Sequence, residues 1–468
     1  MSIEEIKAMG KRLADHLASK HGIKLKHSAI LEAMAVQLGC KDWNTLVAQF
    51  TPDVSPTVRP AVSLKDSYLL GTSAKGPCAL TYPEMTRNLL ISGQRGAGSS
   101  IVVHNLLQQQ IRKGGGFFYL GTSPDENLRQ FVQGEWKHSD RAEALRILNF
   151  SEDASTCCLN PLSSGEPGKI AQIALAPLTR KHEGADAYWI SFAHVLLERL
   201  VAGLQLLERP VTFEALVHLL EDTQALARLG RALPESNSVA THLRALASAL
   251  EDGDKAACSV AALILTTLRP FTQGLLGATL NGGKEEVDLA ALVDQQQGLF
   301  ITVDGLEHSR SNLEAGSFII EQLQRVVWER CGAGSASRSS LPFLVFIQQA
   351  GPYVTDRLDS LLGKARGAGM GFVLVQDSLS TEILDKRSLA ALTGFGTTKL
   401  FLQQGTAASA RYVSALIGRD YVQKDANALA PEIVERAPAD TLLTLEVGHG
   451  WLMREAQATP IRVTAPQS

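Results

Sequence analysis

The chain has 468 residues, of which 45% are hydrophobic and 20% are charged. At about 100–200 residues per domain, this length predicts two to four structural units, each large enough to bury a core. The 45 Lys and Arg residues nearly balance the 48 Asp and Glu residues, which leaves a net charge of −3. This balance excludes a strongly basic nucleic-acid coat and an acidic solvating tail, but it allows a local basic patch.

The cysteine pattern and the apolar stretches bear on the cellular compartment. The six cysteines are scattered without zinc-ligand spacing, and they predict free thiols in a reducing environment. The apolar stretch Ala256–Leu268 is shorter than the ~20 residues needed to cross a bilayer. The first 30 residues are charged and amphipathic, unlike a signal peptide. We therefore expect a soluble cytoplasmic protein without a transmembrane segment.

Residues 1–50 are predicted to form a small helical domain. Apolar residues recur at helical spacing from Ile6 to Leu17 and from Ile30 to Leu38, and a short helix is expected around Trp43. The segment is mildly basic, with seven Lys and Arg against five Asp and Glu. A three-helix interaction module is the preferred interpretation. A DNA-reading helix–turn–helix is the alternative, although base-facing polar residues cannot be identified.

The proline-rich residues 51–63 predict an exposed linker, and an α/β core follows it. Short apolar runs alternate there with helical patterns, which predicts a mostly parallel sheet covered on both faces. The predicted strands are Asn88–Ile91, Phe117–Leu120, Arg146–Phe150, Leu299–Val303, Phe343–Ile347, Phe372–Val375 and Lys399–Leu402. We assign residues 64–170 and 259–468 to this core.

Residues 171–258 interrupt the alternation and are predicted to form an all-helical insertion. Apolar residues recur at helical spacing from Trp189 to Leu207, and the pattern continues to Leu229. We expect Trp189, Phe192 and Leu196 to lie in the core of this insertion.

A glycine-rich turn after the first core strand is the most informative segment. It consists of Gly93, Gln94, Arg95, Gly96, Ala97, Gly98, Ser99 and Ser100, and a helix follows. A strand, a glycine turn and a helix N-terminus together direct backbone N–H groups at an anion, as in a phosphate-binding loop. The spacing fits the Walker A pattern, but Ser99 stands at the lysine position. Ser100 keeps the hydroxyl that would face Mg²⁺.

The charge that bridges the β- and γ-phosphates is therefore missing. Arg95 could replace it in part, but a solvated side chain is the preferred interpretation. The strand that should end in acidic residues ends in Gln348 and Gln349, and amides are weak Mg²⁺ ligands. Asp304, at the end of another apolar strand, is a competing candidate of low specificity. We expect no catalytic residue and no metal site, and the only cofactor to consider is ATP or ADP with weak Mg²⁺ dependence.

From about residue 85 to 455, the chain resembles the cytoplasmic ATPase domain of type IV secretion coupling proteins, the TraD/TraG-like branch of the FtsK/HerA class. The motifs occur in the family's order. They are the Gly93–Ser100 loop, Gly116–Leu120, Leu159-Asn160-Pro161-Leu162, the Phe343–Ile347 strand, Ala365-Arg366-Gly367-x-Gly369, Phe372–Leu379 and Thr398–Phe401. The resemblance implies a RecA-like P-loop NTPase core with an all-α insertion.

The chain departs from that family where the chemistry should be. Besides Ser99 and the two glutamines, Asp377 stands where the family carries a phosphate-sensing Gln, with Gln376 one position away. The transmembrane hairpin of many members is also missing. The resemblance therefore implies a pseudo-ATPase.

The N-terminal unit has a resemblance of its own. The pattern Leu25-x-His27-Ser28, followed by Leu38-Gly39 and Asp42–Leu46, is similar to a small "glyoxalase-related" helical domain of mobile-element proteins. That name implies no catalysis here.

Three hypotheses about function remain. The first is an impaired coupling-type protein that acts with DNA, a relaxosome, type IV secretion components or an active ATPase paralogue. It would form a hexamer or a hetero-oligomer. Lys364 and Arg366 would then face a central pore, contact DNA or contact a neighbouring subunit. The second is a structural adaptor without DNA or nucleotide. The third is an active motor in which Arg95 and Asp304 take over the lost roles.

Overall fold

The chain divides into two units in the computed structural model, residues Met1–Ser63 with Gly418–Ala437 and residues Leu64–Ile417 with Pro438–Ser468. The structure describes residues 3–21, 26–37, 43, 64–122, 125–139, 141, 145–150, 154–179, 186–283, 285–303, 309–332, 341–353, 356–394, 398–422, 432–455 and 457–466. The predicted linker at 51–63 lies outside these residues, as does most of the helix expected around Trp43.

In the first unit, helices α1 (Ile3–His21) and α2 (His27–Gln37) pack against each other. Ile6, Ile30 and Met34 are buried between them, and the Trp43 backbone N–H donates a 2.9 Å hydrogen bond to Glu32. The helical periodicity of the first 37 residues is therefore realised as predicted. The same unit contains a two-stranded antiparallel hairpin, β10 (Arg419–Val422) and β11 (Glu432–Glu435).

The second unit is built on one sheet of eleven strands in the order β2-β1-β13-β12-β9-β3-β8-β7-β4-β6-β5. The seven predicted strands are confirmed as β3 (Leu89–Ser92), β4 (Phe117–Gly121), β5 (Arg146–Asn149), β6 (Gly298–Thr302), β7 (Phe343–Gln348), β8 (Met370–Gln376) and β9 (Thr398–Phe401). They pair in parallel with one another. The α/β fold class with a mostly parallel sheet is therefore confirmed.

Four further strands extend the sheet in antiparallel pairing, and the apolar runs did not predict them. They are β1 (Ser67–Ser73), β2 (Gly76–Thr81), β12 (His449–Arg454) and β13 (Gln457–Val463). β12 pairs with β9, the first strand of the parallel part, so the last two strands of the chain join this part to β1 and β2.

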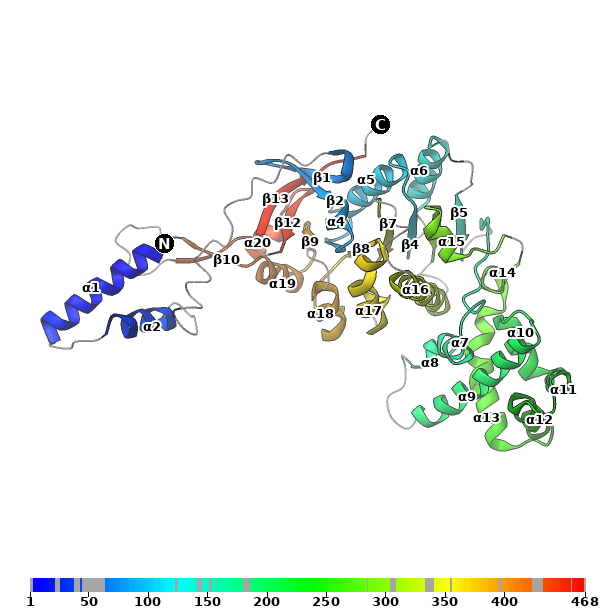
Figure 1. The fold of residues 1–468 in the computed structure, drawn as a ribbon. Helices are drawn as coiled ribbons and strands as arrows, with labels where there is room; N and C mark the ends of the chain where they lie inside the picture. The colour runs from blue at the N-terminus through cyan, green and yellow to red at the C-terminus, as the bar shows by residue number, and fades with distance from the viewer. Residues whose placement is uncertain are drawn as a thin grey trace. The chain divides into compact units, whose positions relative to one another are not determined.

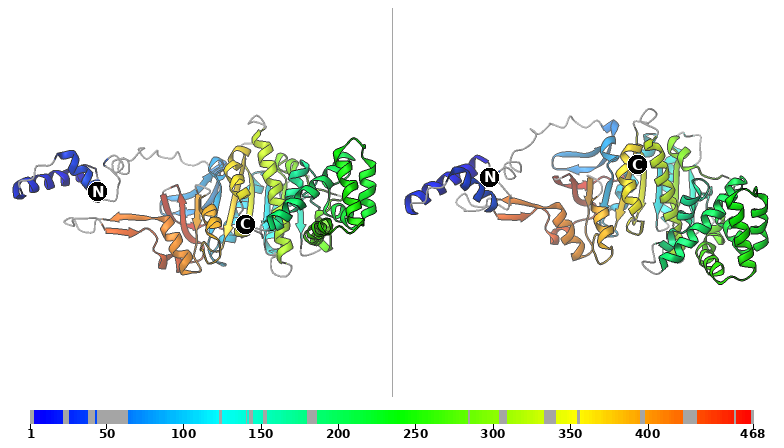
Figure 2. Two further views of the ribbon diagram at one scale, coloured as in Figure 1. Left: turned by 90° about the horizontal axis from the view of Figure 1, so that it is seen from below. Right: turned by 60° about the horizontal axis from the view of Figure 1, so that its bottom comes forward.

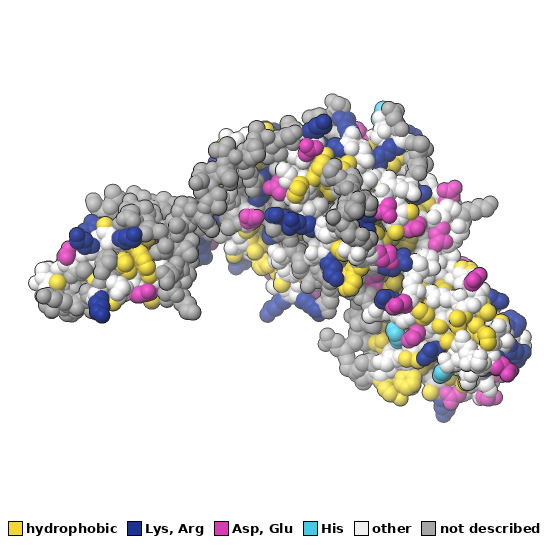
Figure 3. Space-filling model, viewed as in Figure 1, with side chains coloured by type: hydrophobic (Ala, Val, Ile, Leu, Met, Phe, Trp, Pro, Cys, Tyr) yellow, Lys and Arg dark blue, Asp and Glu magenta, His cyan; other side chains and the backbone are white. Residues whose placement is uncertain are grey.

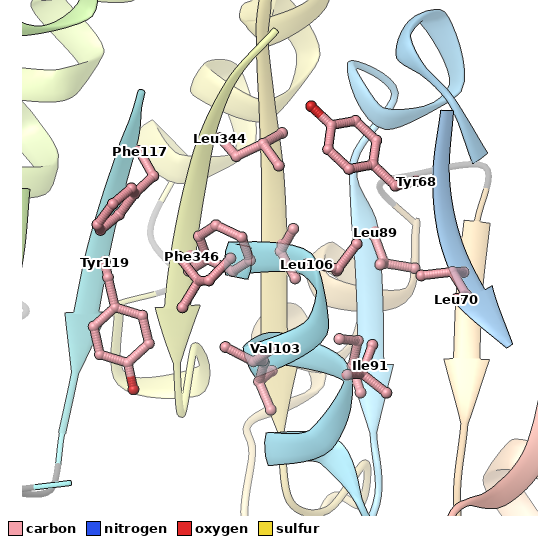
Figure 4. Packing of buried hydrophobic residues seen from close by; sticks show 14 of the residues in the cluster. Tyr68, Leu70, Leu89, Ile91, Val103, Leu106, Phe117, Tyr119, Leu344 and Phe346 are labelled. Carbon is pink, nitrogen blue, oxygen red and sulfur yellow. The ribbon is translucent and has the colours of Figure 1, made fainter. Parts of the chain in front are cut away.

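Helices cover both faces of the sheet (Figures 1 and 2). One face carries α5 (Ser99–Arg112) and α6 (Glu126–Lys137), and the other carries α16 (Ser309–Gly332), α17 (Asp356–Ala365) and α18 (Lys386–Gly394). Val103 and Leu106 of α5 point at the strand residues Leu89, Ile91 and Phe346 (Figure 4). Because both faces are covered, the central strands are buried at every position, which explains their continuous apolar runs.

The described residues between β5 and β6 are mainly helical, and this region includes the insertion predicted at residues 171–258. The helices are α7 (Pro167–Ala174), α8 (Ala176–Thr179), α9 (Asp186–Leu206), α10 (Phe213–Glu221), α11 (Thr223–Ala232), α12 (Ser238–Glu251), α13 (Lys255–Leu268), α14 (Gly274–Leu280) and α15 (Leu289–Asp294). The remaining short helices are α4 (Tyr82–Met85), α19 (Ala407–Ile417) and α20 (Ala439–Leu443). The division of the chain at 171 and 258 stays a prediction.

The expected core of this helical region was wrong. Trp189 and Phe192 are 40% and 49% exposed, and Leu196 is only partly buried. The buried face of α9 is formed instead by Ala193, Leu197 and Leu200. Because α9 is apolar on both sides, its helical period could not show which stripe faces inward.

No single described helix is long and apolar enough to cross a membrane. The helical segments Lys255–Phe271 and Gly274–Leu280 meet the length and composition criterion only together, and they are bent by 91° at the break between them.

Two alanine substitutions distinguish the sheet core from the exposed stripe. Phe346→Ala should lower the free energy of unfolding by about 3–5 kcal/mol, because Phe346 is fully buried under α5. Trp189→Ala should cost less than about 1 kcal/mol, because much of its ring is already in water. Denaturant unfolding followed by circular dichroism measures both, and equal losses would contradict the assignment of the core.

Candidate nucleotide-binding site

The parallel strands bring the candidate residues to one edge of the sheet. Ser92 at the end of β3 pairs with Gln376 of β8, and Val375 of β8 pairs with Gln348 of β7. The segments that follow these strands therefore start side by side. The carboxyl edge of a parallel sheet is where α/β folds hold their ligands, so this edge is the candidate site.

The glycine turn connects β3 to α5, as the sequence predicts. Gly98 precedes α5 in a left-handed conformation, with φ at 107°, and α5 has no side-chain cap. The Gln94 N–H donates to the Gln403 carbonyl at 2.8 Å, and the Ala97 N–H donates to the Gln94 carbonyl at 3.0 Å. Backbone hydrogen bonds within the loop and to the segment after β9 thus fix the loop, and no side chain caps the first N–H groups of α5.

Arg95 does not replace the missing lysine in this structure. Its side chain is 85% exposed and forms a 3.2 Å ion pair with Asp377. Asp377 follows β8, at the position where the resemblance implies a sensor glutamine. An exposed pair of this kind contributes about 0–1 kcal/mol to stability. The pair therefore directs Arg95 towards the end of β8.

The end of β7 presents amides and a hydroxyl, but no carboxylate. Gln348 ends the strand, and its side chain hydrogen-bonds with Tyr119 of β4. Burial raises the pKa of Tyr119, so the phenol stays protonated. Gln349 follows with φ at 51°. Because neither glutamine carries a negative charge, this strand end lacks the oxygen ligand that Mg²⁺ prefers.

Gln376, the neighbouring candidate for the sensor position, has a structural bond. It is 3% exposed, and its Oε1 accepts a 2.8 Å hydrogen bond from the Gly351 N–H. It therefore stabilises the turn after β7.

The competing acidic candidate, Asp304, lies outside the described residues. Among the residues that are described, no group of three or more His, Cys, Asp or Glu side chains could hold a metal ion.

Lys364 and Arg366 lie at the opposite edge of the sheet. Both precede Met370, which begins β8, whereas the glycine loop follows the end of β3, and these strands are parallel. Both side chains are exposed, and the Lys364 ammonium lies 3.3 Å from the centre of the Trp328 ring. They are therefore remote from the phosphate loop of their own chain, and the sequence could not show this separation.

The turn before β12 also contacts the loop, and sequence reasoning missed it. The Gly448 N–H donates a 2.9 Å hydrogen bond to the Ala97 carbonyl. A Cβ atom on Gly98 would lie 3.1 Å from the Gly448 nitrogen. No local signal could reveal this contact, because the two glycines are 350 residues apart in the printed sequence.

The second unit has a RecA-like α/β fold, and solved structures of type IV secretion proteins share this fold. The bacterial conjugative coupling protein TrwB in its unbound form has a TM-score of 0.61 at 16% identity, covering 85% of this chain and 90% of that chain. TrwB in complex with a non-hydrolysable ATP analogue gives 0.61 at 15% identity, with the same coverage. VirB4 of Thermoanaerobacter pseudethanolicus gives 0.54 at 13% identity, covering 86% and 96%.

The N-terminal residues match a different model. Residues 1–77 match the family described as "Glyoxalase superfamily protein", which confirms the resemblance seen in the first helices. A search of curated protein sequences found no match. The resemblance to coupling proteins is thus a shared fold with low sequence identity.

Two glycine substitutions test the geometry of the loop. Gly98→Ala should destabilise the second unit by about 1–3 kcal/mol, because its φ is positive and the new methyl group would press on Gly448. Gly363→Ala is the matched control: it lies in α17 with no atom within 4 Å, so it should be neutral or stabilise by up to about 1 kcal/mol. Thermal unfolding compares them, and a tolerated Gly98→Ala would contradict the loop conformation.

Proposed function

We propose that this protein is a catalytically impaired relative of the conjugative coupling ATPases, and that it acts in the cytoplasm in recruiting or transferring DNA or protein substrates of a type IV secretion system. One observation carries the proposal. The sheet edge and its glycine loop are intact, but the positions that carry charge in an ATPase hold Ser99, Gln348 and Gln349.

The loop residues define what binding can remain. The backbone N–H groups at the start of α5 would face a phosphate, and the Ser100 hydroxyl would stand beside it. Mg²⁺ in an intact site of this class neutralises the charge that develops on the phosphates. With no lysine and no carboxylate at the described positions, this chain would supply orientation for a nucleotide but little stabilisation of the transition state.

The likeness to TrwB and VirB4 supports the biological setting. In the coupling class that the sequence resembles, subunits form hexameric rings. We propose that this chain joins such an assembly, as a ring of its own or with an active ATPase paralogue. A structural adaptor on the same fold is the alternative, and it would bind neither nucleotide nor DNA.

The central expectation concerns turnover. Wild-type protein should release no phosphate from Mg²⁺–ATP above background, because each missing charge would have to be replaced for useful acceleration. Turnover of even ~0.1 per second that disappears in Gly98→Asp would contradict the proposal, since such a rate still needs large transition-state stabilisation.

A single substitution should strengthen ATP binding without restoring hydrolysis. Ser99→Lys places an ammonium at the Walker position of an already formed loop. A charge-assisted hydrogen bond of about 1.5–3 kcal/mol should tighten ATP binding roughly 10- to 100-fold. Ser99→Met, which has comparable bulk and no charge, is the matched control and should not tighten it. Calorimetric titration measures both, and equal affinities would show that the loop does not cradle phosphate.

Lys364 and Arg366 provide the test for DNA. If both meet phosphates, the Lys364→Ala/Arg366→Ala double variant should reduce the slope of log affinity against log salt by about 1.4–1.8. The Lys75→Ala/Lys137→Ala variant removes the same charge from other exposed positions and should leave the slope unchanged. If the double variant instead dissociates the oligomer at an unchanged slope, these residues form a subunit contact. If the wild-type protein is a monomer and does not bind DNA at ~50 mM salt, the structural-adaptor hypothesis is favoured.

A further inference from the structure

One face of α9 carries large hydrophobic side chains into solvent. Tyr188, Trp189, Phe192 and Val195 are 61%, 40%, 49% and 51% exposed. The three aromatic rings contact one another, with the Tyr188 and Phe192 ring centres 4.7 Å apart. Hydrophobic side chains gather over this helix on the molecular surface (Figure 3). Contiguous exposed hydrophobic surface of this kind marks an interaction site.

This face is one wall of a groove, which we call the α9 groove. Its volume is about 290 Å³, and its other walls come from α12 and α13. His242 and Leu246 line it on α12, and Ala257 and Val260 line it on α13. The small residues of α13 leave room where the aromatic residues of α9 project. The groove is therefore a concave apolar site between helices.

The spacing along α9 indicates the shape of the occupant. Tyr188, Phe192, Val195 and Arg199 follow one another at intervals of four, three and four residues, and all line the groove. This is the spacing of a coiled-coil seam, in which side chains of one helix interdigitate with those of a second helix. An exposed seam of this spacing fits a helix laid along it.

The charges in the groove indicate the chemistry of that helix. The Nε of Arg199 is inaccessible to solvent and has no hydrogen-bond partner among the described residues. Among the described residues, the groove lining includes Arg199 and His242 but no carboxylate. A guanidinium N–H that is shielded from water and has no partner is unfavourable, so an acidic residue on the occupant would be stabilised beside the half-buried Arg199. The described lining residues of a second copy would bring no carboxylate to Arg199, which favours a different partner over self-association.

We propose that the α9 groove is a docking site for an amphipathic helix of a partner protein, with large apolar residues at heptad spacing and an Asp or Glu facing Arg199. The apolar residues supply most of the binding energy, and the carboxylate fixes the register of the helix. This role does not depend on nucleotide binding at the sheet edge.

A displayed library of single helices tests the proposal on the full chain. The library has an apolar heptad seam and is randomised at the flanking positions; it is selected on wild-type protein and counter-selected on Phe192→Ser. We expect enriched helices to carry Asp or Glu at one fixed position. Phe192→Ser and Arg199→Ala should each weaken the selected helix at least about tenfold. Leu206→Ser, an equally exposed position of α9 outside the groove, should change nothing.

Charge exchange makes the test specific for Arg199. Arg199→Glu should abolish binding of the acidic helix, and replacing its Asp or Glu with Lys should recover binding to this variant. Enrichment without an acidic preference, or binding that Phe192→Ser leaves intact, would overturn the proposal. A wild-type dimer in analytical ultracentrifugation that Phe192→Ser dissociates would also overturn it, because the face would then bind a second copy.

Discussion

The parallel register of β3, β8 and β7 is the constraint on which the candidate site depends. Ser92 pairs with Gln376, and Val375 pairs with Gln348, so three strands end at one level of the sheet. The glycine loop, the Arg95–Asp377 ion pair and the two glutamines lie at this edge because of that register. The buried aliphatic and aromatic residues on both faces hold the register, since a slip of one residue would turn each core side chain to the other face.

The hydrogen bonds at this edge do not depend on the charged side chains of an ATPase site. Backbone hydrogen bonds and left-handed glycine form the loop, and the Ser99 side chain is not needed for either. Gln348 keeps a hydrogen bond with Tyr119 at the end of a buried strand. Under the proposed function, uncharged side chains at Ser99, Gln348 and Gln349 would remove catalytic groups without disturbing these backbone and side-chain hydrogen bonds.

The parts of the fold that follow from local pattern could be predicted from the sequence. The seven central strands are continuous apolar runs because both faces of the sheet are covered, and the glycine loop has a specific spacing. The strands β1, β2, β12 and β13 have weaker patterns. They form two local antiparallel pairs, β1 with β2 and β12 with β13, and the contact of β1 with β13 joins the two ends of the second unit's sequence. The contact of Gly448 with the loop was invisible for the same reason.

The helical region shows a different limit. The apolar period of α9 was clear, but Trp189 and Phe192 were assigned to the wrong side. Leu197 and Leu200 supply a second apolar stripe on the same helix, and the packing of α12 and α13 decides which stripe is buried. The position of Lys364 and Arg366, opposite to the loop, likewise required the strand directions. The sequence pattern predicts the period of apolar residues along a helix or strand, but only the sheet topology shows at which end of the strands a residue lies.

The Mg²⁺ dependence of nucleotide binding by the wild-type chain tests the central claim most directly. ATP affinity is measured by equilibrium titration in Mg²⁺ and in EDTA. If the end of β7 offers amides in place of carboxylates and Asp377 stays paired with Arg95, Mg²⁺ should change the affinity by less than about tenfold, which is ~1.4 kcal/mol. Tightening of 100-fold or more by Mg²⁺ would contradict the account, because it would require a carboxylate ligand such as Asp304 at this edge.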